Sequence, residues 1–468
     1  MMEDTIVAIS TPSGSGAIAL VRLSGLNAWS ILDKSFLPYR KSLNINNSKG
    51  YTIHYGKIRD GQKELDDVVI TLFKAPHSYT GEDLVEIACH GSVYIQRELV
   101  NLLVRKGARV AKPGEFTQRA FLNGKMDLSQ AEAVADLIAS NSRAAHQLAI
   151  SQMRGGFSKE LSIIRAELLH FVSLIELELD FSEEDVEFAD RTSLKLLIDG
   201  ILDKVSRLAV SFDLGNAIKS GVPVAIVGET NVGKSTLLNK LLKEEKAIVS
   251  EIAGTTRDVI EDCIHLRGIE FRFIDTAGIR DTHDEIEHIG IERSYAQMNK
   301  ARIILLIADA TAPEEQSLWW VEKISGHARK DQHLAILVNK SDLNPEEAEK
   351  RMHRIKEVLA SGSNPPILKI SAKKGSGMPQ LEDALLDLVH LEDLESSDVI
   401  ISNARHYEAL VHARTALERT RISLDTGTSA EYLAQDIREA LFFLGQITGE
   451  IATEEVLGNI FKNFCIGK

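Results

Sequence analysis

The first 120 residues alternate short runs of β-branched and other apolar residues with turns. Runs of this composition are typical of strands in a sheet with at least one buried face. They cover residues 5–9, 17–23, 68–73 and 84–88. We therefore predict an α+β domain with a substantial sheet at the start of the chain.

From residue 127 the apolar positions recur at three- and four-residue steps, which is the helical period. Asp127 or Ser129 can cap the first helix. Further helical patterns run over residues 161–179, 193–214, 401–422, 429–448 and 453–464. These patterns predict bundle helices on both sides of a central segment. Either two helical domains flank that segment or one helical domain is interrupted by it, and the sequence favours neither reading decisively.

The central segment opens with an apolar run at 224–227, which predicts a buried strand. The strand leads into G-x-x-x-x-G-K-S at 228–235, and helical spacing follows. Backbone N–H groups of such a loop surround phosphates, the lysine reaches the β and γ phosphates, and the serine completes a Mg²⁺ shell. The sequence thus predicts a phosphate-binding loop with contacts from Asn231, Val232, Gly233, Lys234, Ser235 and Thr236.

Two further motifs have the spacing of GTPase switches. In the segment 254–258, Thr256 is placed to complete Mg²⁺ coordination when a γ-phosphate is present, with Thr255 beside it. A predicted strand at 271–274 leads into Asp275-Thr276-Ala277-Gly278. There Asp275 is expected to hold the Mg²⁺ shell and the Gly278 N–H to meet the γ-phosphate.

Two motifs after later strands predict the choice of base. Asn339-Lys340-Ser341-Asp342 follows a strand at 334–338, and the Asp342 carboxylate can accept from guanine N1–H and its 2-amino group. Ser371-Ala372-Lys373 follows a strand at 367–370 and offers a backbone N–H to guanine O6. Five motifs in order, each at a strand end, predict that residues 218–379 bind GTP.

Hydrolysis needs a further group, because Ile279 stands where Ras-like switches carry a water-orienting glutamine. Asn231, with backbone carbonyls of residues 250–255, is a candidate site for a monovalent cation beside the phosphates. Glu287 lies in an acidic segment that, from pattern alone, is more typical of a solvated helix start.

The amino-acid composition limits the cellular compartments and the binding partners that are expected for this protein. The 468 residues suggest about three domains. With 44% hydrophobic and 26% charged residues, no long apolar run and an acidic N-terminus, the sequence predicts a cytoplasmic protein without a membrane anchor. Three widely spaced cysteines indicate a reducing compartment. The net charge of −14 argues against a broad nucleic-acid-binding face.

The N-terminal domain shows no motif that identifies its ligand. Residues 14–19 match the dinucleotide pattern G-x-G-x-x-A, but a strand rather than a helix is predicted after them, so we interpret the match as a turn. Cys89-His90 lacks a second ligand pair, which favours a core or turn role over a metal site. Arg22, Glu86 and Lys125 are, by pattern alone, solvated charges.

The chain closely resembles the MnmE (TrmE) tRNA-modification GTPases over its full length. The residues that carry the resemblance are 253–258, 275–280, 113–116, 120–123 and the terminal Cys465-Ile466-Gly467-Lys468. The resemblance implies a multidomain fold that combines α/β and all-α parts. These are an N-terminal folate-binding and dimerisation domain at 1–120, a discontinuous helical bundle at 121–217 and 380–468, and an inserted Ras-like GTPase domain at 218–379.

The resemblance also implies ligands. A 5-formyl- or methylene-tetrahydrofolate would lie between Arg22, Glu86, Lys125 and Lys468. A K⁺ ion would bind Asn231 and carbonyls of Ser250, Ile252 and Thr255, and would promote pairing of GTPase domains across a homodimer. Glu287 would orient the attacking water. Cys465 resembles the family's tail cysteine, for which a catalytic thiol and a structural tail both remain open.

By the same resemblance, the reaction adds an aminomethyl or carboxymethylaminomethyl group to C5 of the wobble uridine of certain tRNAs. The implied partner is an MnmG (GidA)-type subunit that uses FAD and NADH, forms a heterotetramer or larger complex, and provides most of the tRNA surface. The alternative function is a regulatory GTPase switch, such as a ribosome-assembly factor. No basic RNA-binding domain of the kind such factors carry is evident in the sequence.

Overall fold

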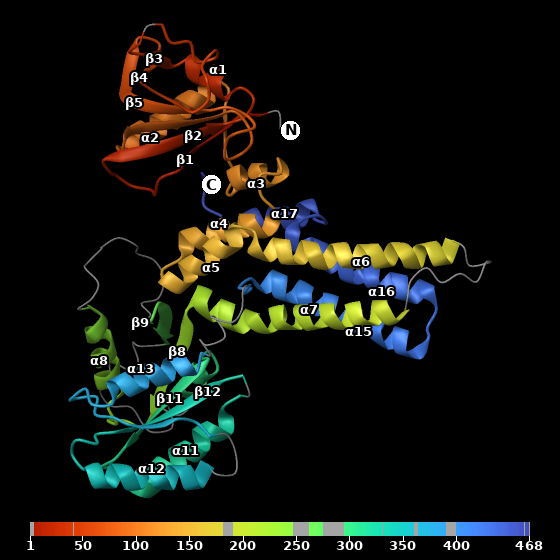
Figure 1. Cartoon of the computed structure of the whole chain (residues 1–468). Helices are drawn as coiled ribbons and strands as arrows, with labels where there is room; N and C mark the ends of the chain where they lie inside the picture. The colour runs from red at the N-terminus through yellow and green to blue at the C-terminus, as the bar shows by residue number, and fades with distance from the viewer. Residues whose placement is uncertain are drawn as a thin grey trace. The chain divides into compact units, whose positions relative to one another are not determined.

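The structure is a computed structural model that describes residues 4–40, 42–180, 191–246, 262–274, 294–329, 331–359, 364–389, 399–462 and 464–467 (Figure 1). The chain divides into two compact units. The first comprises Met1–Ala139, Ile150–Asp203 and Ala409–Lys468, and the second comprises Ser140–Ala149 and Lys204–Glu408. Among the described residues, no helix has the length and apolar character needed to cross a bilayer.

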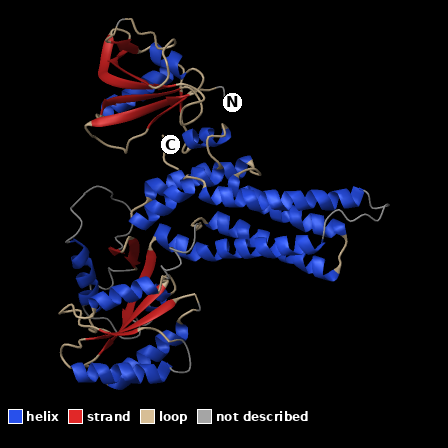
Figure 2. Ribbon diagram, in the orientation of Figure 1, coloured by secondary structure: helices blue, strands red, loops and turns tan. Residues whose placement is uncertain are grey.

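The first unit begins with a seven-stranded sheet in the order β3-β4-β5-β6-β2-β1-β7. Figure 2 draws the strands in red. Only the β1–β7 pair is parallel. The strands are β1 (Ile6–Ile9), β2 (Ile18–Ser24), β3 (Phe36–Pro38), β4 (Thr52–Asp60), β5 (Lys63–Phe73), β6 (Leu84–His90) and β7 (Arg109–Val110). Every strand expected from the apolar runs is present, because those runs supply the buried side of the sheet.

Helices cover the two faces of this sheet unequally. One face packs against α1 (Ala28–Asp33) and α2 (Val93–Arg105) to form the main core. On the other face, Phe116 of α3 (Glu115–Leu122) packs against β1. The strand β2 directly follows the glycines of residues 14–16, which confirms that this stretch does not open a helix. Cys89 is a buried core residue, and no metal-binding group of three or more His, Cys, Asp or Glu occurs among the described residues.

Helices from both sides of the central segment pack together in the first unit. Glu176 of α6 pairs with Arg438 of α16 at 2.5 Å, and Asp199 of α7 pairs with Arg421 of α15 at 3.3 Å. The helices therefore form one discontinuous bundle, which decides between the two readings of the sequence. The helical segments are α4 (Leu128–Ala139), α5 (Arg143–Met153), α6 (Gly156–Asp180), α7 (Arg191–Ser220), α15 (Ala404–Thr426), α16 (Ala430–Thr448) and α17 (Glu454–Lys462).

The second unit contains a six-stranded sheet in the order β13-β12-β11-β8-β10-β9. All its pairs are parallel except β9–β10. Its strands are β8 (Val222–Gly228), β9 (Asp262–Leu266), β10 (Ile269–Phe273), β11 (Ile303–Asp309), β12 (His333–Asn339) and β13 (Ile367–Lys369). Parallel strands covered on both faces are continuous apolar runs, which is why β8 and β12 were recognisable in the sequence.

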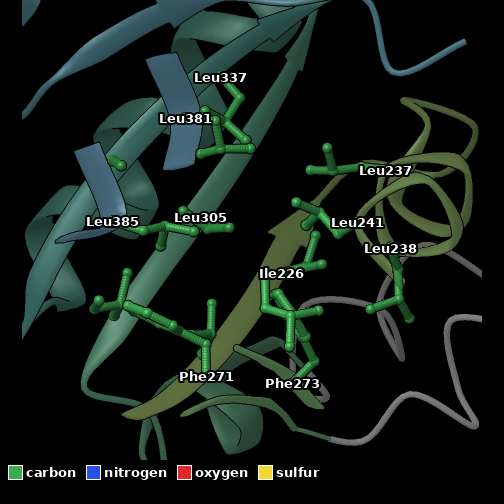
Figure 3. Close-up of a cluster of buried hydrophobic side chains, with 14 of the residues drawn as sticks. Ile226, Leu237, Leu238, Leu241, Phe271, Phe273, Leu305, Leu337, Leu381 and Leu385 are labelled. Carbon is green, nitrogen blue, oxygen red and sulfur yellow. The ribbon is translucent and has the colours of Figure 1, made fainter. Parts of the chain in front are cut away.

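In the described part of the chain, helices cover both faces of this sheet. Apolar side chains of α8 (Lys234–Lys246) and α13 (Met378–Asp387) pack on one face (Figure 3). Those of α11 (Glu314–His327) and α12 (Pro345–Leu359) pack on the other. The predicted domain boundary at 379 falls inside α13, whose Leu381 and Leu385 belong to the core of the sheet.

Candidate functional site

The carboxyl ends of the parallel strands bring four polar segments to one edge of the six-stranded sheet. β8 ends at the predicted phosphate-binding loop, and β12 ends at Asn339. β13 is followed by Ser371, and β11 ends at Asp309. Ligands of open α/β sheets bind outside this edge of the strands, so this edge is the candidate nucleotide site.

The loop after β8 has the backbone of a phosphate-binding loop. Its residues Gly228, Asn231 and Gly233 have positive φ values of 144°, 62° and 104°. A Cβ on Gly228 would lie 2.5 Å from the carbonyl oxygen of Ile307, and one on Gly233 would lie 2.4 Å from Asn339 Nδ2. Glycine is therefore required at both ends of the loop, while asparagine tolerates the left-handed conformation between them.

Lys234 lies at the start of α8 and folds back over the loop. Its Nζ donates hydrogen bonds to the carbonyl oxygens of Gly228, at 2.7 Å, and Glu229, at 2.6 Å. Burial lowers the pKa of Lys234 to about 8, although the Glu229 carboxylate opposes this shift. Ser235 and Thr236 follow in the first turn of the helix, whose unpaired N–H groups favour an anion.

Asn339 connects three loops of the candidate site. Its Nδ2 donates to the Val232 carbonyl at 2.7 Å, and its Oδ1 accepts from the Ala372 N–H at 2.9 Å. The side chain is 3% exposed. One buried amide thus fixes the phosphate-binding loop, the segment 339–342 and the segment 371–373 relative to one another.

Asp342 lies beside the turn after β13. Its Oδ1 accepts a 2.7 Å hydrogen bond from the Ser371 hydroxyl, which holds the pKa of this carboxyl below its usual value. The Ser371 oxygen in turn accepts from the Lys374 N–H at 3.2 Å. Lys373 is exposed. The carboxylate predicted to recognise guanine is therefore an anion next to the segment predicted to bind O6.

Several predicted residues lie outside the described residues. These are Ser250, Ile252, Thr255, Thr256, Asp275, Thr276, Ala277, Gly278, Glu287 and Lys468. The expected coordination of Mg²⁺ and K⁺ by the first five of these, the nucleotide contacts of Thr276, Ala277 and Gly278, and the water-orienting role of Glu287 stay predictions. Of the predicted nucleotide residues that are described, all lie on the three loops that Asn339 joins or on the helix turn after the first.

The sequence patterns did not indicate two further contacts at this edge. Asp309 Oδ2 lies 2.6 Å from Lys340 Nζ, which anchors the second residue of the segment 339–342. Gln316 of α11 donates to the carboxylate of Glu229 in the phosphate-binding loop. An acidic residue at the end of an apolar strand was the available signal for Asp309, but β11 itself was not identified from the sequence.

A second polar site lies on the N-terminal sheet. Arg22 of β2 and Glu86 of β6 are directly opposite in register, and Arg22 Nη2 and Nε lie 2.6 Å and 3.1 Å from Glu86 Oε1. The guanidinium lies over the rings of Tyr79 and Phe116, 5.5 Å and 5.8 Å from their centroids. Aromatic faces attract a cation at such distances, so the Arg22 guanidinium is held on several sides.

The C-terminal tail reaches this second site. The Gly467 carbonyl accepts from Arg22 Nη1 at 3.4 Å and from the Ser10 hydroxyl at 3.1 Å. Cys465 is exposed, and its carbonyl accepts from the Gly114 N–H at 3.4 Å. Lys125 Nζ donates to the Pro76 carbonyl at 3.0 Å. The structure thus brings Arg22, Glu86 and the tail together, while Lys125 binds the neighbouring loop.

The sequence analysis also did not predict a buried ion cluster around Arg119 of α3. Arg119 of α3 is 1% exposed, and its guanidinium binds Glu82 at 3.1 Å and Glu115 at 3.2 Å. Asp4 binds the same group at 2.6 Å. The cluster fixes the loop that carries Tyr79 against α3. The hydrophobic pattern of the sequence could not predict this cluster, because its residues are charged and come from distant parts of the chain.

Family models and known proteins resemble this chain over most of its length. A family model described as MnmE helical domain matches residues 128–465, and one described as GTP-binding protein TrmE N-terminus matches residues 5–125. A protein of Bacteroides thetaiotaomicron described as tRNA modification GTPase MnmE is 53% identical over 468 residues, 100% of both chains. A Flavobacterium johnsoniae protein with the same description is 50% identical over 468 residues, 100% of this chain and 99% of its own.

Solved structures with similarity to this chain include the G-domain of FeoB from Methanococcus jannaschii. It is 26% identical, with a TM-score of 0.26, and the match covers 36% of this chain and 98% of that one.

Proposed function

The chain belongs to the MnmE family of tRNA modification GTPases, and we propose that it uses GTP and a tetrahydrofolate one-carbon unit to modify tRNA. The modification would add an aminomethyl or carboxymethylaminomethyl group to C5 of the wobble uridine of certain tRNAs. The observation that carries the nucleotide part is the convergence of three loops on Asn339.

Guanine is the base that this edge fits best. The Asp342 carboxylate is an acceptor, and it lies beside Ser371 in the segment that offers backbone N–H groups. Guanine presents two adjacent donors, N1–H and the 2-amino group, and one acceptor, O6. Adenine in the same place would leave the buried polar groups unpaired, which costs about 10⁴ or more in discrimination.

Two metal ions complete the proposed nucleotide site. Ser235, in the first turn of α8 beside the phosphate-binding loop, fits the role of a Mg²⁺ ligand together with Thr256 and Asp275. Mg²⁺ would neutralise charge on the β and γ phosphates. Asn231, with φ at 62° and an exposed side chain in that loop, fits a K⁺ ligand together with carbonyls of Ser250, Ile252 and Thr255. K⁺ would supply positive charge in a site that has no glutamine after Gly278, and Glu287 would orient the water.

The Arg22 site supports the folate part of the proposal. The pterin ring presents the same donor pair as guanine, and Glu86 is a carboxylate suited to accept from it. Tyr79 and Phe116 offer aromatic surface beside it. The Gly467 carbonyl accepts a hydrogen bond from Arg22, and Lys468 is the residue that follows Gly467 in the sequence. Lys125 would contact the folate from the loop at Pro76.

An exposed apolar patch on the sheet face that carries Arg22 supports a homodimer. Exposed apolar patches of this kind mark protein–protein interfaces. The patch contains Ile18, Ile53, Tyr55 and Val69, which are 70%, 69%, 51% and 40% exposed. We propose that a second copy of the chain covers it. An MnmG-type subunit with FAD and NADH would join the dimer and provide most of the tRNA surface, consistent with the net charge of −14.

Nucleoside analysis of bulk tRNA from a deletion strain tests the proposal. We expect unmodified wobble uridine in the deletion strain, restoration by the wild-type chain, and no restoration by an Asp342→Asn chain. An unchanged nucleoside profile in the deletion strain would contradict the modification role and favour the regulatory GTPase alternative. Ribosome-assembly intermediates in the same strain, measured by sucrose gradients, would then identify that alternative.

A further inference from the structure

Asp309 and Lys340 form an ion pair between neighbouring strands at the nucleotide edge. Asp309 is the last residue of β11, and Lys340 follows the last residue of β12. Their side-chain atoms Oδ2 and Nζ lie 2.6 Å apart, and the Asp309 side chain is 10% exposed. Lys340 has φ at 63°, a conformation uncommon for a long side chain. The ion pair therefore fixes a residue whose backbone is itself unusual.

The other oxygen of Asp309 is fixed by the turn that follows β11. Its Oδ1 accepts from the Thr311 N–H at 2.8 Å and from the Thr311 hydroxyl at 2.7 Å. Burial raises the pKa of Asp309, but the hydrogen bonds from Lys340 and Thr311 outweigh burial and lower it. Asp309 is thus ionised. Its Oδ1 accepts hydrogen bonds from Thr311 in the turn, and its Oδ2 pairs with the Lys340 ammonium.

A buried arginine holds the same turn from below. Arg351 of α12 is 1% exposed. Its Nη1 donates to the Asp309 carbonyl at 3.2 Å and to the Ser317 hydroxyl at 2.6 Å, and its Nη2 donates to the Ala312 carbonyl at 2.8 Å. The cost of burying a guanidinium is offset by the hydrogen bonds that its donors make, which here come from the two Nη atoms. Arg351 therefore anchors the backbone from which Asp309 projects.

The ion pair has a consequence for Asp342, which lies two residues after Lys340. A carboxylate that accepts from a base loses discrimination when an ammonium neutralises it. Cations do lie close, since Lys374 Nζ is 3.8 Å from Asp342 Oδ2. In the described part of the chain, Lys340 pairs with Asp309 and not with Asp342.

We propose that Asp309 is a positioning residue of the guanine site, which holds the Lys340 ammonium and leaves the Asp342 carboxylate to the base. Arg351 contributes indirectly, because its hydrogen bonds fix the turn that carries Asp309. The inference rests on the proposed assignment of residues 339–342 as the guanine site. It predicts that Asp309 affects the recognition of the base and does not affect the binding of phosphate.

The Asp309→Asn variant of the full chain separates these effects. Asparagine keeps an oxygen for Thr311 and replaces the other oxygen with an amide that repels the Lys340 ammonium. We expect the preference for GDP over ADP, measured from dissociation constants by calorimetry, to fall about tenfold, as for the loss of one charged hydrogen bond. The dissociation constant for pyrophosphate should stay unchanged. The matched control, Glu314→Gln, breaks the exposed Glu314–Arg354 pair in the same domain and should change neither.

A double-mutant cycle tests whether Asp309 acts through Lys340. In a Lys340→Met background no ammonium from residue 340 can reach Asp342, so adding Asp309→Asn should cause no loss of the GDP preference relative to Lys340→Met alone. An unchanged preference in folded Asp309→Asn protein, an equal loss of pyrophosphate binding, or an additive loss in the Lys340→Met background would each overturn the inference. If Asp309→Asn failed to fold, Thr311→Val, which removes the hydroxyl donor to Asp309 Oδ1, must lower the GDP preference without weakening pyrophosphate binding. A wild-type chain without guanine preference, or an Asp342→Asn variant that retained it, would instead refute the proposed function.

Discussion

The ammonium group of Lys234 lies 2.7 Å from the backbone carbonyl oxygen of Gly228 and donates a hydrogen bond to it. The lysine thus binds the loop whose N–H groups are suited to phosphates. Burial lowers its pKa to about 8 from the ordinary value of 10.5. Bound phosphates would add negative charge beside the ammonium and raise the pKa again.

Nucleotide binding should therefore take up a proton at alkaline pH. Between the folded and ordinary pKa values of Lys234, the native chain binds fewer protons than the unfolded chain, so its stability rises with pH in that window. At about pH 9 most Lys234 is neutral, and GDP binding should take up nearly one proton, against almost none at about pH 7. Calorimetry in two buffers with different ionisation enthalpies measures this uptake. Lys234→Arg, which stays charged, is the control, and equal uptake by that variant would contradict the assignment.

Removal of the Asn339 side chain should loosen three loops at once. Asn339→Ala leaves the Val232 carbonyl and the Ala372 N–H without their partner, and we expect a loss of about 2–4 kcal/mol in the stability of this unit. Thermal unfolding and amide exchange of residues 371–375 measure the effect. Asn239→Ala, at an exposed position of α8, should change stability by less than about 0.5 kcal/mol. Similar effects of the two substitutions would refute the bridging role.

Replacement of Gly467 by alanine should release the tail. Gly467 has φ at 93°, and a Cβ there would lie 2.3 Å from the Ile9 carbonyl oxygen. We expect Gly467→Ala to weaken 5-formyltetrahydrofolate binding at least tenfold and to speed digestion by carboxypeptidase, because the hydrogen bonds from Arg22 and Ser10 are lost. Gly458→Ala in α17, where a Cβ meets nothing within 4 Å, is the matched control. Faster digestion with unchanged folate affinity would show that the tail docks without closing the site.

The Arg119 cluster should make the N-terminal domain sensitive to acid. Burial raises the pKa of Glu115, but hydrogen bonds from Arg109, the Lys112 N–H and Arg119 outweigh it and lower the pKa below 4.5. A carboxyl whose pKa is lower in the folded state than in the unfolded state stabilises the fold at pH values above the unfolded-state pKa. This stabilisation is lost as the pH falls through the folded-state pKa. Glu115→Gln should lower the thermal midpoint at neutral pH and flatten its fall below about pH 4.5.

The control for the acid experiment is Glu64→Gln. Glu64 forms exposed ion pairs with Lys57 and Arg59, which solvent screens. Its removal should leave the pH profile of the thermal midpoint unchanged. A Glu115→Gln profile parallel to the wild-type profile would exclude Glu115 as the acid-sensitive group.

Exchange of K⁺ for Na⁺ should lower GTP turnover severalfold, because the larger ion would match the proposed site of carbonyl oxygens and the Asn231 side chain. Steady-state phosphate release at constant ionic strength measures it. In Asn231→Ala, turnover in K⁺ should fall to the wild-type value in Na⁺. Equal wild-type rates in the two salts would remove the cation from the proposed site.

Local patterns were sufficient for much of the fold. The buried strand, glycine-rich loop and helix of residues 222–246 depend on neighbours a few residues away. The same holds for the cap at Asp127, whose Oδ1 accepts from the Gln130 N–H at 2.9 Å. Strands β3, β4 and β11 were not identified from the sequence, although the apolar run of β11 is as buried as that of β8.

The sequence by itself determined the nucleotide-binding motifs, their order and the two-sided helical pattern, because each is written in contiguous residues. Only the tertiary structure decided that the helices form one bundle, that Asp309 binds Lys340, and that Gly467 meets Arg22, 445 positions away. Strand order and helix packing set these pairings. They depend on how the whole sheet or bundle buries its apolar surface, and no local run of residues encodes that choice.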